Sequence, residues 1–184
     1  ASAGGALDIL YLLGADEIAM AAIGETTFVI YQGSHGDAGA HRADVVLPSA
    51  AYTEKAATYV NLEGRAQMTN RAAFAPGEAK EDWAIIRALS AHAGHTLDYD
   101  QPQALRAIMY KTAPQLMRLD AVTPAQLTGV AALAARQGAI AVEPFANAVS
   151  DYYLTNPIAR ASPIMADLSA LKKGWDRETT GTHG

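Results

Sequence analysis

The sequence predicts an α/β fold in which a partial parallel sheet is followed by a helical C-terminal region. Three short apolar runs lie in the first 50 positions and end near Gly or Pro, whereas the second half carries apolar residues at helical spacing. Half of the 184 residues are hydrophobic but only 7% are aromatic, so the core must be built from small side chains. This length allows one core, or one core with a small appendage.

The predicted strands span Asp8–Leu13, Thr27–Tyr31 and Asp44–Leu47, and each is apolar nearly throughout. Continuous apolarity is typical of strands that are buried on both faces, as in a parallel sheet. Residues 15–26 have room for a short helix, whereas residues 33–43 are rich in Gly and are expected to form a loop. Three strands are too few for a complete Rossmann-like sheet, so this half is interpreted as the end of one.

The first two predicted helices cover residues 81–93 and 102–112. The earlier one places Ile85 and Leu89 on a single apolar face, and its first turn is acidic, which suits the helix dipole. The later one groups its apolar residues in the same way.

Two further helices are predicted from their start signals. Thr123-Pro124 has the pattern of an N-cap followed by Pro at the first helical position, and that helix should end near Gly138. The last helix starts at Asn156-Pro157 or at Ser162-Pro163, because Pro is unfavourable inside a helix. Residues 174–184 are polar and are expected to be disordered.

These elements divide the chain into three predicted parts. Residues 1–78 form the end of an α/β domain, residues 79–173 form a helical region, and residues 174–184 form a tail. The N-terminus has no signal for secretion and no initiator Met, so we expect the chain to be part of a longer protein.

Composition excludes several classes of function. The net charge is −5 with scattered Lys and Arg, which argues against binding to nucleic acid. The absence of Cys excludes disulfides, thiolate zinc sites and cysteine-ligated iron–sulfur clusters within these residues. No apolar stretch approaches the ~20 residues that span a bilayer, so direct membrane insertion is not expected.

The Gly-rich segment from Gly33 to His41 suggests three kinds of site. It could bind phosphate at the end of a strand, or combine Ser, His and Asp as a catalytic triad, or ligate a metal through His35, Asp37 and His41. None of these matches a standard spacing. A flexible Gly-rich turn with polar caps is therefore the favoured interpretation.

A second polar group begins at the start of the third strand and continues after it, at Asp44, Glu54, Asn61, Glu63 and Arg65. Acids and bases in such loops can polarise a substrate or hold a phosphate. More often they form local ion pairs and hydrogen bonds that stabilise an irregular loop. We interpret these five residues as structural anchors, and no catalytic, cofactor-binding or metal-binding residue is assigned.

Several of these segments together resemble one protein family in order and spacing. They are Tyr31–Gly39, Ala43–Pro48, Tyr52–Asn61, Glu63–Gln67, Glu81–Leu89 and Tyr152–Ser162. The chain resembles the C-terminal part of the large iron–sulfur subunit of NADH:quinone oxidoreductase, which is respiratory complex I. That subunit, of the G type, lies within the molybdopterin oxidoreductase superfamily.

The resemblance implies a non-catalytic scaffold within an enzyme that transfers electrons from NADH to quinone and translocates protons. It implies 2Fe-2S and 4Fe-4S clusters in an N-terminal part that is not in this sequence, and no cofactor in this stretch. The implied partners are that N-terminal part and other peripheral-arm subunits. The implied location is peripheral, on the cytoplasmic side of the bacterial inner membrane or the matrix side of the mitochondrial one.

Two alternatives remain at this point. One is a fragment of a pterin-binding molybdenum oxidoreductase, similar to formate dehydrogenase, with pterin contacts near residues 14–16 and 33–39. The other is a free-standing nucleotide-binding module, although a phosphate loop and a ribose-binding acid are not evident. On its own, a partial sheet is expected to aggregate or to pair with its missing half.

Overall fold

The structure is a computed structural model, and it describes residues 7–124, 126–135, 138 and 142–175. The described chain divides into two compact units. The first unit contains residues 7–51, 75–85 and 147–175, and the second contains residues 52–74 and the described part of 86–146. Each unit is described by itself below.

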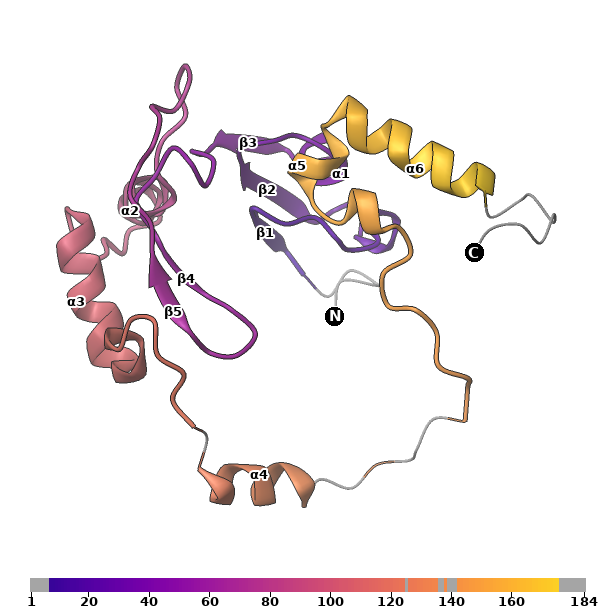
Figure 1. The fold of residues 1–184 in the computed structure, drawn as a ribbon. Helices are drawn as coiled ribbons and strands as arrows, with labels where there is room; N and C mark the ends of the chain where they lie inside the picture. Colours follow the sequence, from indigo (N-terminus) through magenta and orange to yellow (C-terminus); the bar gives the residue numbers. More distant parts are fainter. Residues whose placement is uncertain (1–6, 125, 136–137, 139–141, 176–184) are drawn as a thin grey trace. The chain divides into compact units, whose positions relative to one another are not determined.

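The first unit is built on a three-stranded parallel sheet (Figure 1). Strand β1 covers Ile9–Leu13, β2 covers Phe28–Gly33 and β3 covers Val45–Pro48, in the order β1-β2-β3. In the register, Tyr11 is opposite Ile30, which is opposite Val45 on the other side. The predicted parallel sheet is confirmed, with every strand within two residues of its expected bounds.

The connections between these strands differ from the prediction. Residues 15–26 contain one 3-10 turn, η1, at Met20–Ala22 instead of a short α-helix. The Gly-rich segment, expected to be a loop throughout, contains the short helix α1 at Ala38–Arg42. Helix α1 was missed because five residues are too few to show helical periodicity.

The core of this unit lies on one face of the sheet. It consists of Leu12, Ile23, Val29 and Tyr31, with neighbouring side chains from η1 and α1 packed against it. Because side chains alternate between faces, Ile9 and Phe28 lie on the opposite face, where they are 62% and 44% exposed. The expectation that the strands are buried on both faces is therefore wrong at the start of β1 and β2, whereas Gln32, further along the same face, is fully buried.

The C-terminal segment of the first unit contains three short helical elements. They are η3 at Tyr152–Leu154, α5 at Pro157–Arg160 and α6 at Pro163–Trp175. Both start signals left open by the sequence are used, because the side chain of Asn156 accepts a hydrogen bond from the Ala159 N–H (2.9 Å) and α6 then begins at Pro163. The tail beyond residue 175 lies outside the described residues.

Helix α2, Asp82–His92, begins in the first unit and ends in the second. The second unit continues with α3 at Pro102–Thr112 and η2 at Pro114–Met117. The predicted helices at 81–93 and 102–112 are thus confirmed. Among the described residues, no helix is long and apolar enough to cross a membrane.

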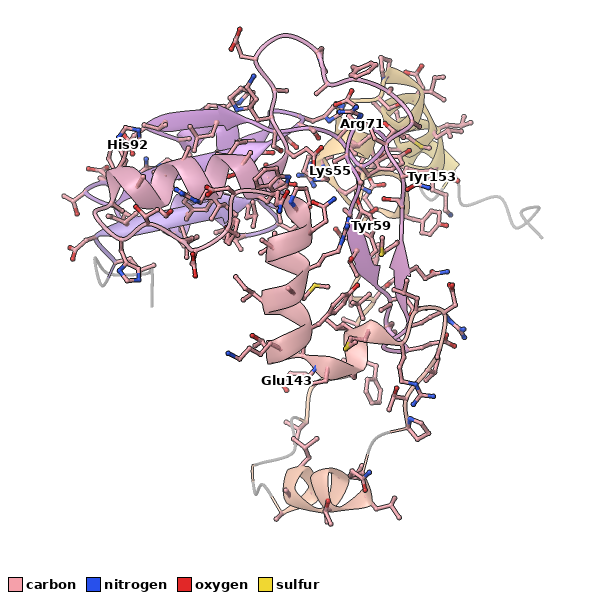
Figure 2. The ribbon with its side chains drawn as sticks, turned by 90° about the vertical axis from the view of Figure 1, so that its left-hand side faces the viewer. Lys55, Tyr59, Arg71, His92, Glu143 and Tyr153 are labelled. Carbon is pink, nitrogen blue, oxygen red and sulfur yellow. The ribbon has the colours of Figure 1, made fainter. Side chains whose placement is uncertain are left out.

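The second unit also contains an antiparallel hairpin that the sequence did not predict. Strand β4, Thr58–Val60, pairs with β5, Ala66–Met68, and Gly64 makes the turn with φ +81°. Figure 2 shows Lys55 and Tyr59, which belong to the turn before β4 and to β4 itself. Three residues per strand are too few to reveal a period of two.

Helix α4 begins later than expected, at Leu127, and ends at Ala134. Thr123-Pro124 precedes it without starting it, and Gln126 occupies the N-cap position with no side-chain hydrogen bond. Its apolar residues are exposed, with Leu127 at 84%. Start signals describe local preference only, and packing of a face normally supplies most helical stability.

Candidate functional site

The carboxyl ends of β1 and β2 bring together four charged side chains. Asp16 and Glu17 follow β1, and Asp37 follows β2 as the N-cap residue of α1. The carboxyl ends of parallel strands meet at one edge of a sheet, where ligands bind in open α/β folds. Here Arg160, from α5, contacts all three carboxylates. We call these four residues the Arg160 cluster.

Arg160 binds the three acids with different atoms. Its Nη2 donates to Asp16 Oδ1 and its Nε donates to Asp37 Oδ2, while Nη1 lies 3.5 Å from Glu17 Oε1. The Asp16 side chain is 0% exposed and that of Arg160 is 23% exposed. A planar guanidinium suits this arrangement because its five N–H donors point in fixed directions. The cluster is therefore a partly buried ion-pair network centred on the buried Asp16.

The same carboxylate of Asp16 also fixes the start of α1. Its Oδ2 accepts a hydrogen bond from the Gly39 N–H at 2.9 Å. A Cβ on Gly39 would lie 2.7 Å from Asp16 Cβ and 2.9 Å from Tyr31 Cδ2, so only Gly fits there. The Tyr31 hydroxyl donates to the His35 carbonyl at 2.5 Å. Close packing and internal hydrogen bonds therefore account for the glycine and polar residues of this segment.

The charges in the cluster shift three pKa values. The hydrogen bond from Arg160 is the main cause that lowers the pKa of Asp37. Burial lowers the pKa of Arg160, but the hydrogen bond to Asp37 and the charge of Asp16 outweigh it, and the net pKa is raised. Burial, and then the charge of Asp16, raise the pKa of Tyr31. The ionised forms of Asp37 and Arg160 are thus stabilised together.

The geometry does not support the three sites considered for the Gly-rich segment. Ser34 Oγ lies 3.0 Å from His35 Nδ1 on the surface, but Asp37 is bound to Arg160, so no Ser-His-Asp triad forms. No group of three His, Cys, Asp or Glu residues in the described part of the chain could hold a metal ion. The Gly39 N–H is bound to Asp16 and is therefore not available to a phosphate.

A buried polar chain joins the sheet to α2. The Gln32 side chain is fully buried, accepts a hydrogen bond from the Tyr11 hydroxyl and donates to Asp82 Oδ1 at 2.8 Å. Burial, and then the charge of Asp82, raise the pKa of Tyr11. This chain holds the first turn of α2 against the sheet. The sequence offered one weak signal for it, a Gln placed directly after the apolar run 27–31.

Asp44, the first of the predicted anchors, connects two strands of the first unit. Its Oδ2 accepts a hydrogen bond from the Val29 N–H at 2.7 Å, and its own N–H donates to the Val29 carbonyl at 2.8 Å. Arg42 lies 3.7 Å from the carboxylate and donates to the carbonyls of Gly24 and Thr27. Asp44 therefore lies where the start of β3 meets β2.

The other predicted anchors lie in the second unit. Asn61 Oδ1 accepts hydrogen bonds from the N–H groups of Glu63 and Arg65, both at 3.0 Å, and so shapes the hairpin turn. Arg65 Nη2 lies 3.3 Å from Glu63 Oε2. Glu54 is half-buried in the turn before β4, outside the hairpin turn. Nearby, the Arg71 guanidinium lies 4.5 Å from the centroid of the Phe74 ring (Figure 2).

Arg65 has a second partner, Asp120, that the sequence did not reveal. Arg65 Nη1 donates to the Asp120 carbonyl at 2.7 Å, the Asp120 N–H donates to the Ala66 carbonyl at 2.8 Å, and Gln67 Nε2 donates to Asp120 Oδ1 at 3.1 Å. Asp120 has φ +59°, a conformation that non-Gly residues other than Asn and Asp seldom adopt. We call this contact, made by Arg65, Ala66, Gln67 and Asp120, the Asp120 clamp.

Comparison with known proteins agrees with this architecture. A model of the molybdopterin oxidoreductase family matches residues 1–92, which include the whole parallel sheet. The chain belongs to the molybdopterin oxidoreductase family. A second model, for the C-terminal part of the G-type subunit of NADH-ubiquinone oxidoreductase, matches residues 121–168, which include α4, α5 and Arg160. This second match favours the complex I interpretation over the one similar to formate dehydrogenase.

Three curated relatives show the extent of the similarity. The chain is 48% identical to the mitochondrial 78 kDa subunit of NADH-ubiquinone oxidoreductase from Neurospora crassa, over 92% of this chain and 23% of the relative. It is 45% identical to the same subunit from Candida albicans, over 85% and 23%. It is 43% identical to the mitochondrial NADH dehydrogenase [ubiquinone] iron-sulfur protein 1 from Solanum tuberosum, over 89% and 22%. The chain spans less than a quarter of the length of these relatives.

The pterin-binding alternative would place a phosphate-bearing pterin group at the carboxyl edge of the sheet, near residues 14–16 and 33–39. Phosphates bind where N–H groups and cations are available to them. Here the Gly39 N–H and the Arg160 guanidinium are bound to Asp16 and Asp37, and Glu17 adds a third negative charge. The Gly39 N–H and the Arg160 guanidinium are therefore not available to a phosphate at this edge.

Proposed function

We propose that this chain is a non-catalytic scaffold portion of the large iron–sulfur subunit of respiratory complex I. The parent complex would transfer electrons from NADH to quinone and couple this to proton translocation. The main support is the match of residues 121–168 to the C-terminal part of that subunit. The identity of 43–48% to three subunits of this oxidoreductase adds to it. The iron–sulfur clusters would lie on cysteines elsewhere in the parent subunit, because this chain has no Cys.

The geometry supports a structural role in preference to a catalytic one. The charged side chains at the carboxyl edge bind one another, and the anchors of the hairpin bind backbone groups. We propose that the chain contacts the rest of its subunit and other peripheral-arm subunits. Its location would be peripheral, on the cytoplasmic side of the bacterial inner membrane or the matrix side of the mitochondrial inner membrane.

The test is Arg65→Ala in the full-length subunit, with the complex isolated from cells. Arg65 holds both Glu63 and Asp120, so its loss should lower the yield of assembled complex. A scaffold predicts that each assembled complex keeps its NADH:quinone activity. A reduced turnover at full assembly would contradict the scaffold role, and Arg118→Ala, a change at an exposed arginine, is the matched control.

Metal analysis of the parent protein separates this proposal from a molybdenum enzyme. We expect iron without molybdenum or tungsten. Stoichiometric molybdenum or tungsten would overturn the scaffold proposal.

A further inference from the structure

Residues 151–173 belong to the last segment of the first unit, which follows the second unit in sequence and contacts the loops after β1 and β2. We call residues 151–173 the C-terminal strap. Figure 1 shows its helices α5 and α6 in the orange and yellow part of the chain. We propose that Arg160 is a latch that closes the C-terminal strap over the carboxyl edge of the sheet, and that the strap opens as one body when this latch is broken.

The first step of the argument is that the C-terminal strap holds itself together. Asp151 accepts hydrogen bonds from the Tyr153 N–H at 3.1 Å and from Ser169 Oγ at 2.5 Å, and Lys173 Nζ lies 2.9 Å from Asp151 Oδ2. Ser169 is buried at 4% exposure. These contacts join η3 to α6, so the two ends of the strap are linked without help from the sheet.

The second step is the way in which the C-terminal strap meets the sheet. Arg160 lies in the short helix between η3 and α6, and it reaches the loops after both β1 and β2. Its partners Asp16 and Asp37 are 144 and 123 residues away in sequence. One guanidinium therefore joins a locally folded segment to two loops that come from the other end of the chain.

The third step is that the loops depend on the latch. Asp16 is fully buried and holds the Gly39 N–H with one oxygen and Arg160 with the other. Without Arg160, that carboxylate would be a buried charge without its cation, a state that proteins avoid by local opening or protonation. Opening of the strap and loosening of the loops at 14–17 and 35–40 should therefore occur together.

Hydrogen exchange measured by mass spectrometry on the intact protein tests the latch. In Arg160→Ala we expect the amides of 151–173, 14–17 and 35–40 to exchange about tenfold faster or more, while the core of β2 keeps its protection. Arg160→Lys should give a smaller increase in the same segments, because an ammonium keeps the charge but loses the fork of donors. Arg118→Ala, at an exposed arginine outside the cluster, should match the wild type.

Two results would overturn the latch. One is unchanged exchange in the strap of Arg160→Ala, and the other is an equal increase throughout the chain, which would make Arg160 a residue of global stability only. If Arg160→Ala does not fold, Glu17→Gln provides the same test, because it removes the negative charge 3.5 Å from Arg160 and leaves the contacts of Arg160 with Asp16 and Asp37 intact. It should speed exchange in the same three segments by a smaller factor, and no local increase in this variant would also contradict the latch.

Discussion

The Arg160 cluster and the Asp120 clamp both bind segments that are far apart in the sequence, but they do so in different ways. The Arg160 cluster uses a guanidinium and a carboxylate that is removed from water. The Asp120 clamp uses backbone groups together with the side chains of Gln67 and Asp120, which are exposed, and of Arg65, which is 36% exposed. Removing one of two buried charges leaves the other without a partner and strongly lowers the free energy of unfolding. Water can replace a lost surface contact, so that loss lowers stability only slightly. The two regions should therefore differ sharply in their response to mutation.

The largest effect is expected for Arg160→Ala. It leaves Asp16 buried without its cation, and removing one partner of a buried ion pair costs about 3–5 kcal/mol. We expect the free energy of unfolding to fall by about 3 kcal/mol, measured by chemical denaturation of the intact protein. A loss no greater than that of Arg118→Ala would place the Arg160 cluster in the same class as the surface contacts.

A smaller effect is expected for Asp120 in the clamp. Asp120→Ala removes the hydrogen bond from Gln67 and puts a less tolerant residue at φ +59°, which should cost about 1–2 kcal/mol. Asp120→Asn should be close to neutral, because its amide oxygen can still accept from Gln67 and Asn tolerates this conformation. Denaturation curves in which both variants lose the same stability would show that neither feature of Asp120 matters.

Acid should lower the free energy of unfolding that the Arg160 cluster contributes, because Asp37 becomes protonated. The pKa of Asp37 is lowered in the folded protein, mainly by the hydrogen bond from Arg160, so its contribution is complete above the unfolded pKa of about 3.9. That contribution is lost as the pH falls through the lowered folded value. Asp37→Asn should therefore flatten the stability profile below about pH 4, as measured by denaturation over a pH series. If Asp37→Asn lost stability in acid as steeply as the wild type does, the proposed contribution of Asp37 would be contradicted.

The smallest effect is expected for Glu63→Gln in the second region. Glu63 lies 3.3 Å from Arg65 on the surface, and exposed ion pairs contribute about 0–1 kcal/mol. The hairpin turn should persist, because Asn61 Oδ1 accepts from the backbone N–H of Glu63, and the 3.4 Å hydrogen bond from Asn61 Nδ2 can still be accepted by the side-chain oxygen of Gln. We expect a change below about 0.5 kcal/mol that shrinks further in high salt. A larger loss would show that the clamp depends on this ion pair.

The sequence predicted the regular elements where the signal was long enough. Strands β1 to β3 and helices α2 and α3 were located because continuous apolar runs and helical spacing are local properties. The hairpin and α1 were missed because elements of three to five residues carry too little periodicity. The position of α4 was misjudged because a start signal at Thr123 does not ensure packing.

The predicted anchors included Arg65 but not the residue that it holds. Asn61, Glu63 and Arg65 lie within five positions, so a shared turn could be inferred from their spacing. Asp120 lies 55 residues from Arg65, and its positive φ could not be seen in the sequence. The domain division at residue 78 remains a prediction.

The sequence by itself determined the family, the parallel strands and the absence of cysteine ligands, since these depend on residue identity and local order. Only the tertiary structure decided that Asp16, Asp37 and Arg160 meet at the carboxyl edge. It also decided that Ile9 and Phe28 stay exposed at the start of their strands while Gln32, further along the same face, is buried. The physical reason is that burial and charge pairing depend on which distant segments come together, and residues more than 100 positions apart leave no local pattern of that contact.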